Sequence, residues 1–526
     1  MLPAAILAMC TCLLAPPAKA ETLADAIALA YQSNPTLQSA RAQLRALDES
    51  YVQARAGLRP TAEVQVAPTY QRAQQTNILG QLTDQATNSS AATVQLNQPL
   101  YTGGAATWTI EAASDDIRAA RESLRSTEAQ VLQNVVQAYV DVRRDQKIVT
   151  AYVSEVGILQ SQLDDVTARK AAGDVTRTDV EQSQTQLDSS RAALTLAEGQ
   201  LQVSRSEYFV VVGQNPGTLA PEPPLPGLPT SIDEAYASAQ TDNPVLLQTE
   251  QTERADRARI DEAKAQFGPT VALSTSYGYT GPVEPFAIKN EHRSLTVGVL
   301  LTVPLLTGGV AASNVRKATE IDNSDRLNIE SARRSVVQTV SNAWNLAIAN
   351  RASALSDDHA VDAARKYFSD TEKEYRVAQR STLDVLIAEQ TLRSAEIASA
   401  QAEHDCYLAQ AELLAAVGRL EAADLVADVP IYDPAAAFRK VWRKGAMPWE
   451  DAVAELDRLG APGVAQPRPL SAPAVAKEPA LRSGPQIPDS VPLATNRPIE
   501  PITNTTSPAT PPGLGVDRGE PYTPSP

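Results

Sequence analysis

The chain contains few of the residues from which catalytic and metal sites are usually built. Its 526 residues include three cysteines and three histidines, and His292, His359 and His404 are too far apart to show the spacing of metal ligands. No glycine-rich phosphate-binding loop and no nucleophile with a paired base is recognisable. We therefore predict that the protein is not an enzyme and that it requires no cofactor or metal.

Aromatic residues and positive charge are also scarce. Aromatic residues make up 5% of a chain that is 43% hydrophobic, and this composition suits long helices with narrow apolar seams better than one thick core. The formal net charge is -16. Because phosphate backbones are bound by clustered lysine and arginine, the acidic balance argues against a nucleic-acid partner.

After residue 20 the chain has no apolar run approaching the roughly 18 residues that a membrane helix needs. Residues 1–20 are instead typical of a secretory signal peptide, with an apolar stretch before the small-x-small cleavage pattern Ala18-Lys19-Ala20. Cys10 and Cys12 lie inside this segment, so the mature chain would keep Cys406 alone and form no internal disulfide. Cys10 could alternatively carry a lipid, although the large residue before it disfavours this. A secreted chain without a membrane helix is periplasmic, extracellular or a membrane β-barrel.

The mature chain contains the same pattern twice. The recurring motifs are Asn34-Pro35 with Asn243-Pro244, and Pro99–Gly104 with Pro304–Gly309. The offset changes by four residues between Pro60 and Pro99, so each half has one loop of variable length and a remainder of constant length. We predict two structural repeats and a proline-rich linker, at 21–220, 231–428 and 221–230 respectively.

Each repeat has a segment in which apolar residues alternate with small polar residues. In the second repeat Leu295, Val297 and Val299 alternate with Thr296 and Gly298. Period two with an apolar band on one side is the pattern of a transmembrane strand. We predict β-hairpins at 60–100 and 269–304, four strands in all. A half-buried sheet in a soluble protein would show a similar alternation, and the strands alone do not exclude it.

Long stretches without proline follow each predicted hairpin. In the first, Val131, Ala138, Leu159 and Val166 keep a seven-residue spacing that is typical of coiled coils. We predict helical hairpins over 105–212 and 310–418, the first turning at Gly173. Its outgoing helix of about 68 residues would be roughly 100 Å long. Cys406 falls at a seam position of the second hairpin, where it is expected to be a packed small residue and not a reactive thiol.

Four strands are too few to close a barrel. Open sheet edges are not tolerated in hydrocarbon, because each unpaired backbone group there costs several kcal/mol. A membrane-inserted sheet would therefore require several copies of the chain, with eight, twelve or sixteen strands in total. The predicted fold class is mainly α, with a small transmembrane β part and long coiled-coil helices, and the copy number stays open at this point.

The duplicated plan, the Asn-Pro helix starts, the Pro-Leu-x-x-Gly-Gly strand exits and the stretch Arg380–Leu386 resemble the TolC family of outer-membrane efflux proteins. The resemblance covers roughly residues 21–429, and its motifs recur in order in both halves. It implies a homotrimer, with a 12-stranded β-barrel in outer-membrane lipid continued by a long periplasmic α-barrel. A periplasmic adaptor (membrane fusion protein) and an inner-membrane pump would dock to it.

The function implied by this resemblance is an exit duct for drugs, small molecules or proteins. The sequence does not distinguish drug efflux from type I protein secretion. A function from a different class is also compatible with the helices, namely a structural periplasmic coiled coil that spaces the layers of the cell envelope without conducting anything. The alternating strands argue against this spacer.

The resemblance also implies a gate near the tips of the helical hairpins. Tyr375 and Arg380 match the family's tyrosine and arginine in the second hairpin, and Asp179 matches its aspartate in the first. We therefore expect Arg380 to bond to both Asp179 and Tyr375 and so to hold the closed state. Taken without the resemblance, Asp179 could simply cap the helix that follows the Gly173 turn.

Asp384 matches an aspartate that lines the family's constriction, which implies a ring of three carboxylates that would favour cations. The family's second aspartate is Ile387 in this chain, so a double acidic ring is not expected. Ala378 stands where the family has a tip glycine, whereas Gly173 is present in the other hairpin. The two tips, marked by Gly173 and Ala378, are the expected adaptor contacts.

The chain continues beyond the second repeat. Residues 429–460 contain a probable short helix at 449–459, and we expect them to form a periplasmic collar around the outside of the helical tunnel. Residues 461–526 are rich in proline and poor in large apolar side chains. Such a composition cannot offset the entropy of ordering, so a disordered tail is expected.

Overall fold

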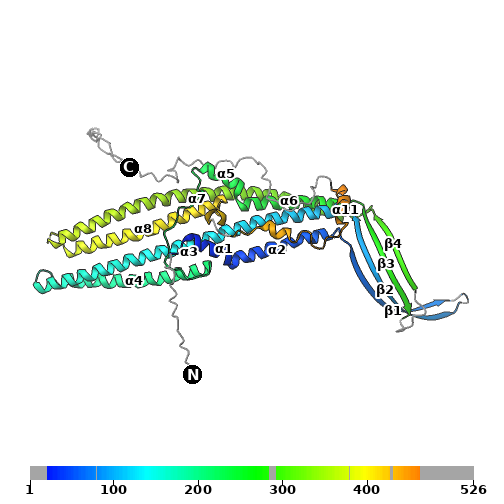
Figure 1. Ribbon diagram of the computed structural model, residues 1–526, viewed down its shortest axis with the longest axis horizontal. Coiled ribbons are helices and arrows are strands. Elements are labelled where there is room, and N and C mark those ends of the chain that lie inside the picture. The colour runs from blue at the N-terminus through cyan, green and yellow to red at the C-terminus, as the bar shows by residue number, and fades with distance from the viewer. Residues whose placement is uncertain are drawn as a thin grey trace, which may run out of the picture.

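The computed structural model describes residues 20–76, 78, 80–282, 292–377, 379–426 and 430–461. It is a long body of near-parallel helices with one β-sheet at an end (Figure 1). The predicted signal peptide at 1–20 and the predicted tail at 461–526 lie outside the described residues, except for residues 20 and 461.

The two halves of the chain have the same order of elements, as the sequence repeat predicts. Two short helices lead into two strands, which lead into a very long helix and a shorter returning helix. The helices of the first half are α1 Leu23–Ser33, α2 Pro35–Ala56, α3 Ala105–Ala172 and α4 Arg177–Val212. Those of the second half are α5 Ile232–Asp242, α6 Pro244–Ala265, α7 Val310–Arg376 and α8 Thr382–Val417.

The repeated Asn-Pro motif starts equivalent helices for a local reason. The Asn34 side chain accepts hydrogen bonds from the backbone N–H groups of Thr36 and Leu37 at the start of α2, and Asn243 does the same at the start of α6. Each asparagine thereby satisfies two donors that the helix leaves unpaired, and the proline that follows already has a helical φ. Each asparagine also donates to a carbonyl near the end of the returning helix, which ties the short helices to the long hairpin.

The sheet has strand order β1-β2-β3-β4 and is antiparallel throughout, with strands β1 Thr61–Thr76, β2 Leu82–Tyr101, β3 Thr270–Pro282 and β4 His292–Thr302. Val64, Val94, Tyr277 and Leu295 are successive cross-strand partners, and the neighbouring row is Gln65, Thr93, Gly278 and Ser294. In these rows one face of the sheet is therefore apolar and the other is mainly polar. The apolar face is open, since Val64 is 71% exposed and Leu295 is 68% exposed.

The predicted heptad seam is buried. Val131, Ala138, Leu159 and Val166 are each 5% exposed or less, and α3 packs along α4 as α7 packs along α8. Cys406 is partly buried on α8, where burial raises the pKa of its thiol. No helix in the described part of the chain has both the length and the apolar content to cross a membrane.

Residues 430–461 lie against the helices of their own chain, and the collar around a tunnel of several copies stays a prediction. The short helix α9, Ala422–Leu425, precedes this segment. The segment itself contains α10 Pro434–Arg439 and α11 Glu450–Asp457, and a 3-10 helix at Arg458–Gly460 follows α11. The segment runs lengthwise toward the sheet, and its contacts move in order from α1 to α2 and then to the end of β2. We call residues 430–461 the C-terminal strap.

Specific polar contacts explain why the C-terminal strap lies along the helices. The Tyr432 backbone N–H donates to the Tyr31 hydroxyl, and the ring of Phe438 meets that of Tyr51 edge to face with centroids 5.2 Å apart. The buried carboxylate of Glu450 then pairs with Arg55 at 2.6 Å, near the end of α2. These partners follow one another along α1 and α2, so the C-terminal strap runs lengthwise over both helices.

Candidate functional site

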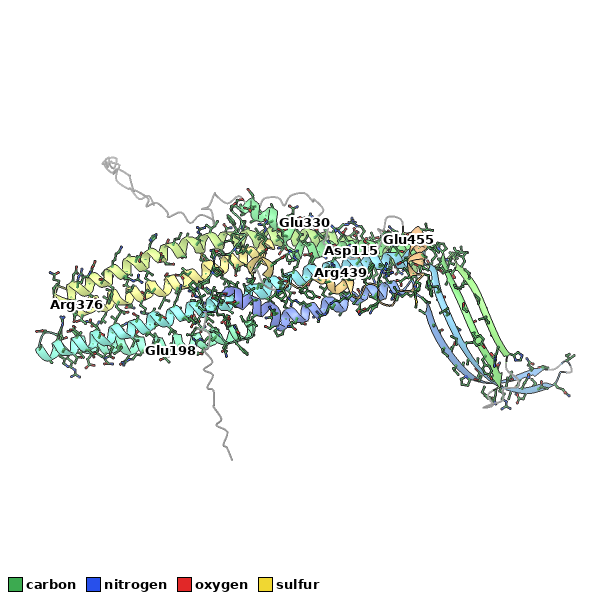
Figure 2. The ribbon with its side chains drawn as sticks, in the orientation of Figure 1. Asp115, Glu198, Glu330, Arg376, Arg439 and Glu455 are labelled. Atoms are coloured by element: carbon green, nitrogen blue, oxygen red, sulfur yellow. The ribbon has the colours of Figure 1, made fainter. Side chains whose placement is uncertain are left out.

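The free ends of the two long hairpins hold the residues that the sequence marks as a gate. They lie at the end of the helical body away from the sheet, where Figure 2 places Arg376. In the first hairpin α3 ends at Ala172 and Gly173 adopts φ 89°, a left-handed conformation that glycine takes without strain. The turn therefore forms where the sequence predicts it.

Asp179 caps the helix that follows this turn. Its carboxylate accepts hydrogen bonds from the backbone N–H and the hydroxyl of Thr176 at 2.8 and 2.7 Å, and the Thr176 hydroxyl accepts from the Asp179 N–H. These hydrogen bonds lower the pKa of Asp179. The simpler reading of Asp179, as a capping residue, is thus correct for the single chain.

The second tip repeats this arrangement 205 residues later. Asp384 accepts from the backbone N–H and the hydroxyl of Ser381 at 2.9 and 2.8 Å, which lowers the pKa of Asp384. Asp384 is partly exposed, and both of these hydrogen bonds use the same carboxylate oxygen. Ala378, the predicted counterpart of Gly173, lies outside the described residues.

The predicted bonds from Arg380 to Asp179 and Tyr375 are not formed within the chain. Arg380 Nε instead donates to Glu374 Oε2 at 2.8 Å, across the turn of its own hairpin. The reason is local: Glu374 is six residues away on the same tip, whereas Asp179 is already engaged by its own cap.

Tyr375 does link the two hairpins, but through a different partner. Its hydroxyl donates to Asp165 Oδ2 on α3 at 3.1 Å, and Arg169 Nε lies 3.0 Å from the same oxygen. The Arg169 guanidinium also lies over the Tyr375 ring, 4.4 Å from its centroid. Sequence reasoning missed Asp165 and Arg169, because an acid and a base four residues apart on a helix are usually a solvent-exposed pair.

A buried charged cluster holds the hairpins together closer to the middle of the helices. Arg393 Nε of α8 lies 2.9 Å from Glu155 Oε1 of α3, and the Arg393 guanidinium also contacts the Tyr152 hydroxyl. Glu389, 3% exposed, shares this site. Burial, together with the nearby Glu155 carboxylate, raises the pKa of Glu389 to about 8. One guanidinium therefore faces two buried carboxyl groups, of which Glu389 is mainly protonated at neutral pH.

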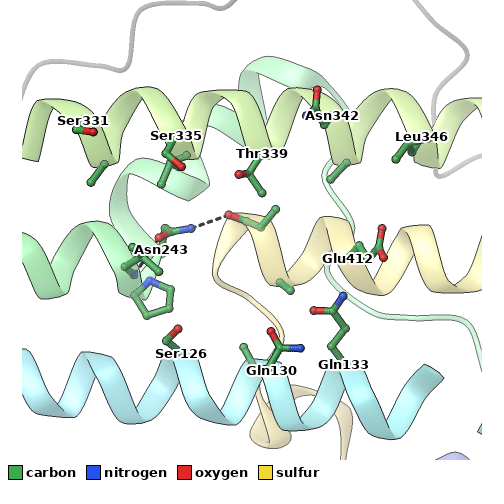
Figure 3. A pocket seen from close by; sticks show the side chains of 18 of the residues that line it. Ser126, Gln130, Gln133, Asn243, Ser331, Ser335, Thr339, Asn342, Leu346 and Glu412 are labelled. Carbon is green, nitrogen blue, oxygen red and sulfur yellow. Dashed lines mark hydrogen bonds between the residues drawn. The ribbon is translucent and has the colours of Figure 1, made fainter. Parts of the chain in front are cut away.

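One cavity in the helical body is lined by neutral polar groups and by apolar side chains. It has a volume of about 660 Å³ and lies where α6 begins, between α3, α7 and α8 (Figure 3). Ser126, Gln130, Asn243 and Thr339 line it, and Glu412 is its one carboxyl group. Among the described residues, no group of three or more histidine, cysteine, aspartate or glutamate side chains could hold a metal ion.

Comparison with known proteins agrees with this architecture. The family model "Outer membrane efflux protein" matches residues 26–211 and 235–419, one match in each repeat. The outer membrane efflux protein BepC of Brucella suis is 31% identical over 438 residues, which cover 83% of this chain and 94% of BepC. The alkaline protease secretion protein AprF of Pseudomonas aeruginosa is 26% identical, over 77% of this chain and 85% of AprF.

The fold has a counterpart among solved structures. The CmeC outer membrane channel of Campylobacter jejuni superimposes with a TM-score of 0.67 over 80% of this chain and 89% of CmeC, at 14% identity. The family is assigned by the match of the family model in both repeats and by the extent of similarity to BepC. The chain therefore belongs to the outer membrane efflux proteins, the TolC family, and is an outer-membrane protein with a periplasmic helical extension and no enzymatic activity.

Proposed function

We propose that this protein is an exit duct that carries substrates across the outer membrane as a homotrimer. The observation that carries the proposal is the sheet, which has an exposed apolar face and whose outermost strands, β1 and β4, pair on one side only within the described chain. Lipid requires such edges to be paired. Three copies of four strands would close a 12-stranded barrel, with the small polar face turned toward its lumen.

The helices would extend this lumen into the periplasm. The 68 residues of α3 span roughly 100 Å at 1.5 Å per residue, so the hairpin tips lie far from the membrane. At that distance a periplasmic adaptor and an inner-membrane pump could dock against the tips around Gly173 and Ala378. A non-conducting envelope spacer would have no use for a sheet with one apolar and one polar face, and we therefore place it second.

We propose that the duct exports more than one kind of substrate. BepC is named as an efflux protein and AprF as a protease secretion protein, and this chain is similar to both over most of its length. We propose export of small molecules or of proteins through the same duct, the choice being made by the pump that docks. The neutral polar lining of the mid-helix cavity favours no single charge type.

The tips would form the gate of this duct. Tyr375 with Asp165 and Arg169 holds the two hairpins of one chain together, and we propose that Arg380 meets Asp179 of a neighbouring copy in the closed trimer. Arg380 is exposed and Asp179 is partly exposed, with both cap bonds of Asp179 on a single carboxylate oxygen, which supports such a contact. Three copies of Asp384 would then form an acidic ring at the constriction. Links of this kind are individually weak, which lets the gate open.

Planar-bilayer conductance of the purified mature protein tests both parts of the proposal. We expect discrete conductance steps that depend on the trimer, small in the wild type and larger in Arg380→Ser. Arg376→Ser is the matched control, because Arg376 lies at the same tip but pairs with Glu372 of its own helix at 2.6 Å. Equal conductance in both variants and the wild type would refute the Arg380 latch. A folded trimer without any conductance would refute the duct.

A further inference from the structure

The C-terminal strap ends in a helix that exposes several apolar side chains close to the sheet. The side of α11 that faces the protein carries the buried carboxylates of Glu450 and Asp457 together with the buried apolar residues Val453 and Ala454. The outward side carries Trp449, Ala452, Leu456 and Leu459, which recur at helical spacing along α11 and the turns at its two ends. Trp449 is 49% exposed and Leu459 is 76% exposed.

This arrangement follows from the ion pairs beneath the helix. Glu450 pairs with Arg55 and Arg59, at 2.6 and 3.0 Å, and Asp457 accepts hydrogen bonds at the start of α3. With Val453 and Ala454 also packed inward, those contacts orient α11 so that Leu456 is left on the exposed side. The exposed carboxylates on the helix are themselves paired, Asp451 with Arg55 and Arg443, and Glu455 with Arg458.

The apolar stripe continues the apolar face of the sheet. The indole N–H of Trp449 donates to the side-chain oxygen of Gln98 on β2 at 3.1 Å. Gln98 is the cross-strand partner of Leu273, which in turn is the partner of Val299 on the exposed apolar face. Trp449 therefore lies beside the apolar face of the sheet, at the end of the sheet that meets the helices. The proposed barrel turns this face toward lipid. Tryptophan favours this position because its ring is apolar and its N–H is polar.

Positive charge accompanies the stripe on the side away from the sheet. Between Pro434 and Trp449 the strap has Arg439, Lys440, Arg443 and Lys444 and no acidic residue. Arg443 pairs with Asp451 and Lys444 with Glu49, and the two cations are still 61% and 59% exposed. Asp451 also contacts Arg55, which lies six residues before β1 in the sequence, so this charge sits at the end of the helical body that meets the sheet. Anionic headgroups at a membrane surface attract lysine and arginine.

We infer that the end of the C-terminal strap docks on the periplasmic leaflet of the outer membrane, with Trp449, Leu456 and Leu459 in the acyl-chain boundary and Arg443 and Lys444 among anionic phospholipid headgroups. The inference rests on the membrane-inserted sheet of the proposed duct. A neighbouring copy of the chain is the other conceivable occupant. The position of α11 argues against it, because α11 packs on β2, an inner strand, and not on the edge strands β1 or β4 where copies would join.

The first test measures where the Trp449 ring lies. The full-length trimer is reconstituted in phosphatidylcholine vesicles, with or without bromine atoms high in the acyl chains, and the emission of wild type is compared with that of Trp449→Phe. The emission that the substitution removes should be quenched at least twofold by the brominated lipid. Trp344→Phe is the control, since Trp344 is buried on α7 in the helical body, and the emission it removes should be unaffected.

Other quenching results would overturn the inference. Quenching of the Trp449 emission by aqueous iodide and not by bromolipid would place the ring in water. Protection from both quenchers would place it under a neighbouring copy. Conductance measured on the same vesicles separates the two proposals, because a conducting trimer with an unquenched Trp449 refutes only the docking, whereas a folded trimer that does not conduct counts against the duct.

The second test concerns charge. Binding of phosphatidylglycerol to the trimer in detergent is followed by native mass spectrometry for the wild type and for Arg443→Gln/Lys444→Gln. Removing two cations near an anionic surface should weaken binding about fivefold each, or up to roughly 30-fold together. The control Lys373→Gln/Arg376→Gln removes the same charge at the hairpin tips and should change nothing. Equal loss in both double variants, or loss in neither, would contradict the assignment of the headgroup site.

Discussion

Asp457 joins the C-terminal strap to the start of the longest helix. Gly104 caps α3 but has no side chain to accept a hydrogen bond, and the fully buried Asp457 carboxylate takes that role from 350 residues away. One oxygen accepts from Thr102 N–H at 2.6 Å, Thr102 hydroxyl at 2.8 Å and Gly104 N–H at 3.2 Å. The other accepts from the N–H and the hydroxyl of Thr107, at 3.2 and 2.8 Å.

Asp457→Ala should therefore open the start of α3 locally. Losing a capping side chain costs about 0.5 to 2 kcal/mol, and buried hydrogen bonds to a charged group contribute about 1.5 to 3 kcal/mol. Because the loosened strap would let water reach the orphaned donors, we expect a local loss of about 2 to 4 kcal/mol and not the sum over five bonds. That loss corresponds to amide exchange roughly 30- to 900-fold faster at Gly104 and Thr107.

Hydrogen-exchange mass spectrometry of the full-length protein measures this effect, and the duplication supplies an internal control. The equivalent start of α7 follows Gly309, which also has no side-chain cap bond, and Asp457 makes no contact there. Exchange in peptides around Val310 should therefore be the same in wild type and variant. Unchanged exchange at Thr107, or equal acceleration at both helix starts, would refute the reasoning that Asp457 is the cap of α3.

Three further predictions concern the hairpins. Because the pKa of Glu389 is raised from 4.5 to about 8, the free energy of unfolding should fall by on the order of 3 kcal/mol as pH rises from about 5 to 8. Glu389→Gln should abolish this fall, and an equal pH dependence of the unfolding temperature in both proteins would contradict it. Tyr375→Phe removes the hydrogen bond from the Tyr375 hydroxyl to Asp165 on α3, which contributes about 1 kcal/mol, and should raise single-channel open probability about fivefold. Unchanged gating would mean that this bond is not part of the gate. Gly418→Ala should lower the free energy of unfolding by at least about 2 kcal/mol, because the new Cβ would lie 2.3 Å from the Asp242 carbonyl oxygen and Gly418 has φ 81°. Gly199→Ala, in open space on α4, should raise it by about 0.5 to 1 kcal/mol. If chemical denaturation showed both variants changing stability in the same direction, the reasoning would be wrong.

The elements that the sequence predicts well are those specified by neighbouring residues. The Asn-Pro motif predicts the start of α2 and of α6, because the asparagine and the N–H groups it accepts from are two and three residues apart. Gly173 predicts the first tip in the same way. The alternation around Leu295 predicts the apolar face of the sheet, since in a strand every second side chain shares a side.

The interactions of the tips are less predictable. The sequence identifies Tyr375, Arg380 and Asp179 as tip residues, yet within the chain each bonds to a different partner from the one expected. Charged residues are frequent along these helices, and a displacement of one helical turn exchanges one carboxylate partner for another. Which acid comes within 3 Å of Arg380 depends on how two hairpins pack, and spacing along one helix does not encode that.

By itself, the sequence determined the duplication, the long helices with their capped starts, the alternating strands and the family to which they belong, because each depends on periodicity or on contacts within a few residues. Only the tertiary structure decided that residues 430–461 run lengthwise as a strap, that Asp457 caps a helix 350 residues earlier in the chain and that Glu389 is buried beside Glu155. These features join groups that are remote in sequence, and the energy that selects them comes from burying charge against a partner that folding alone brings near.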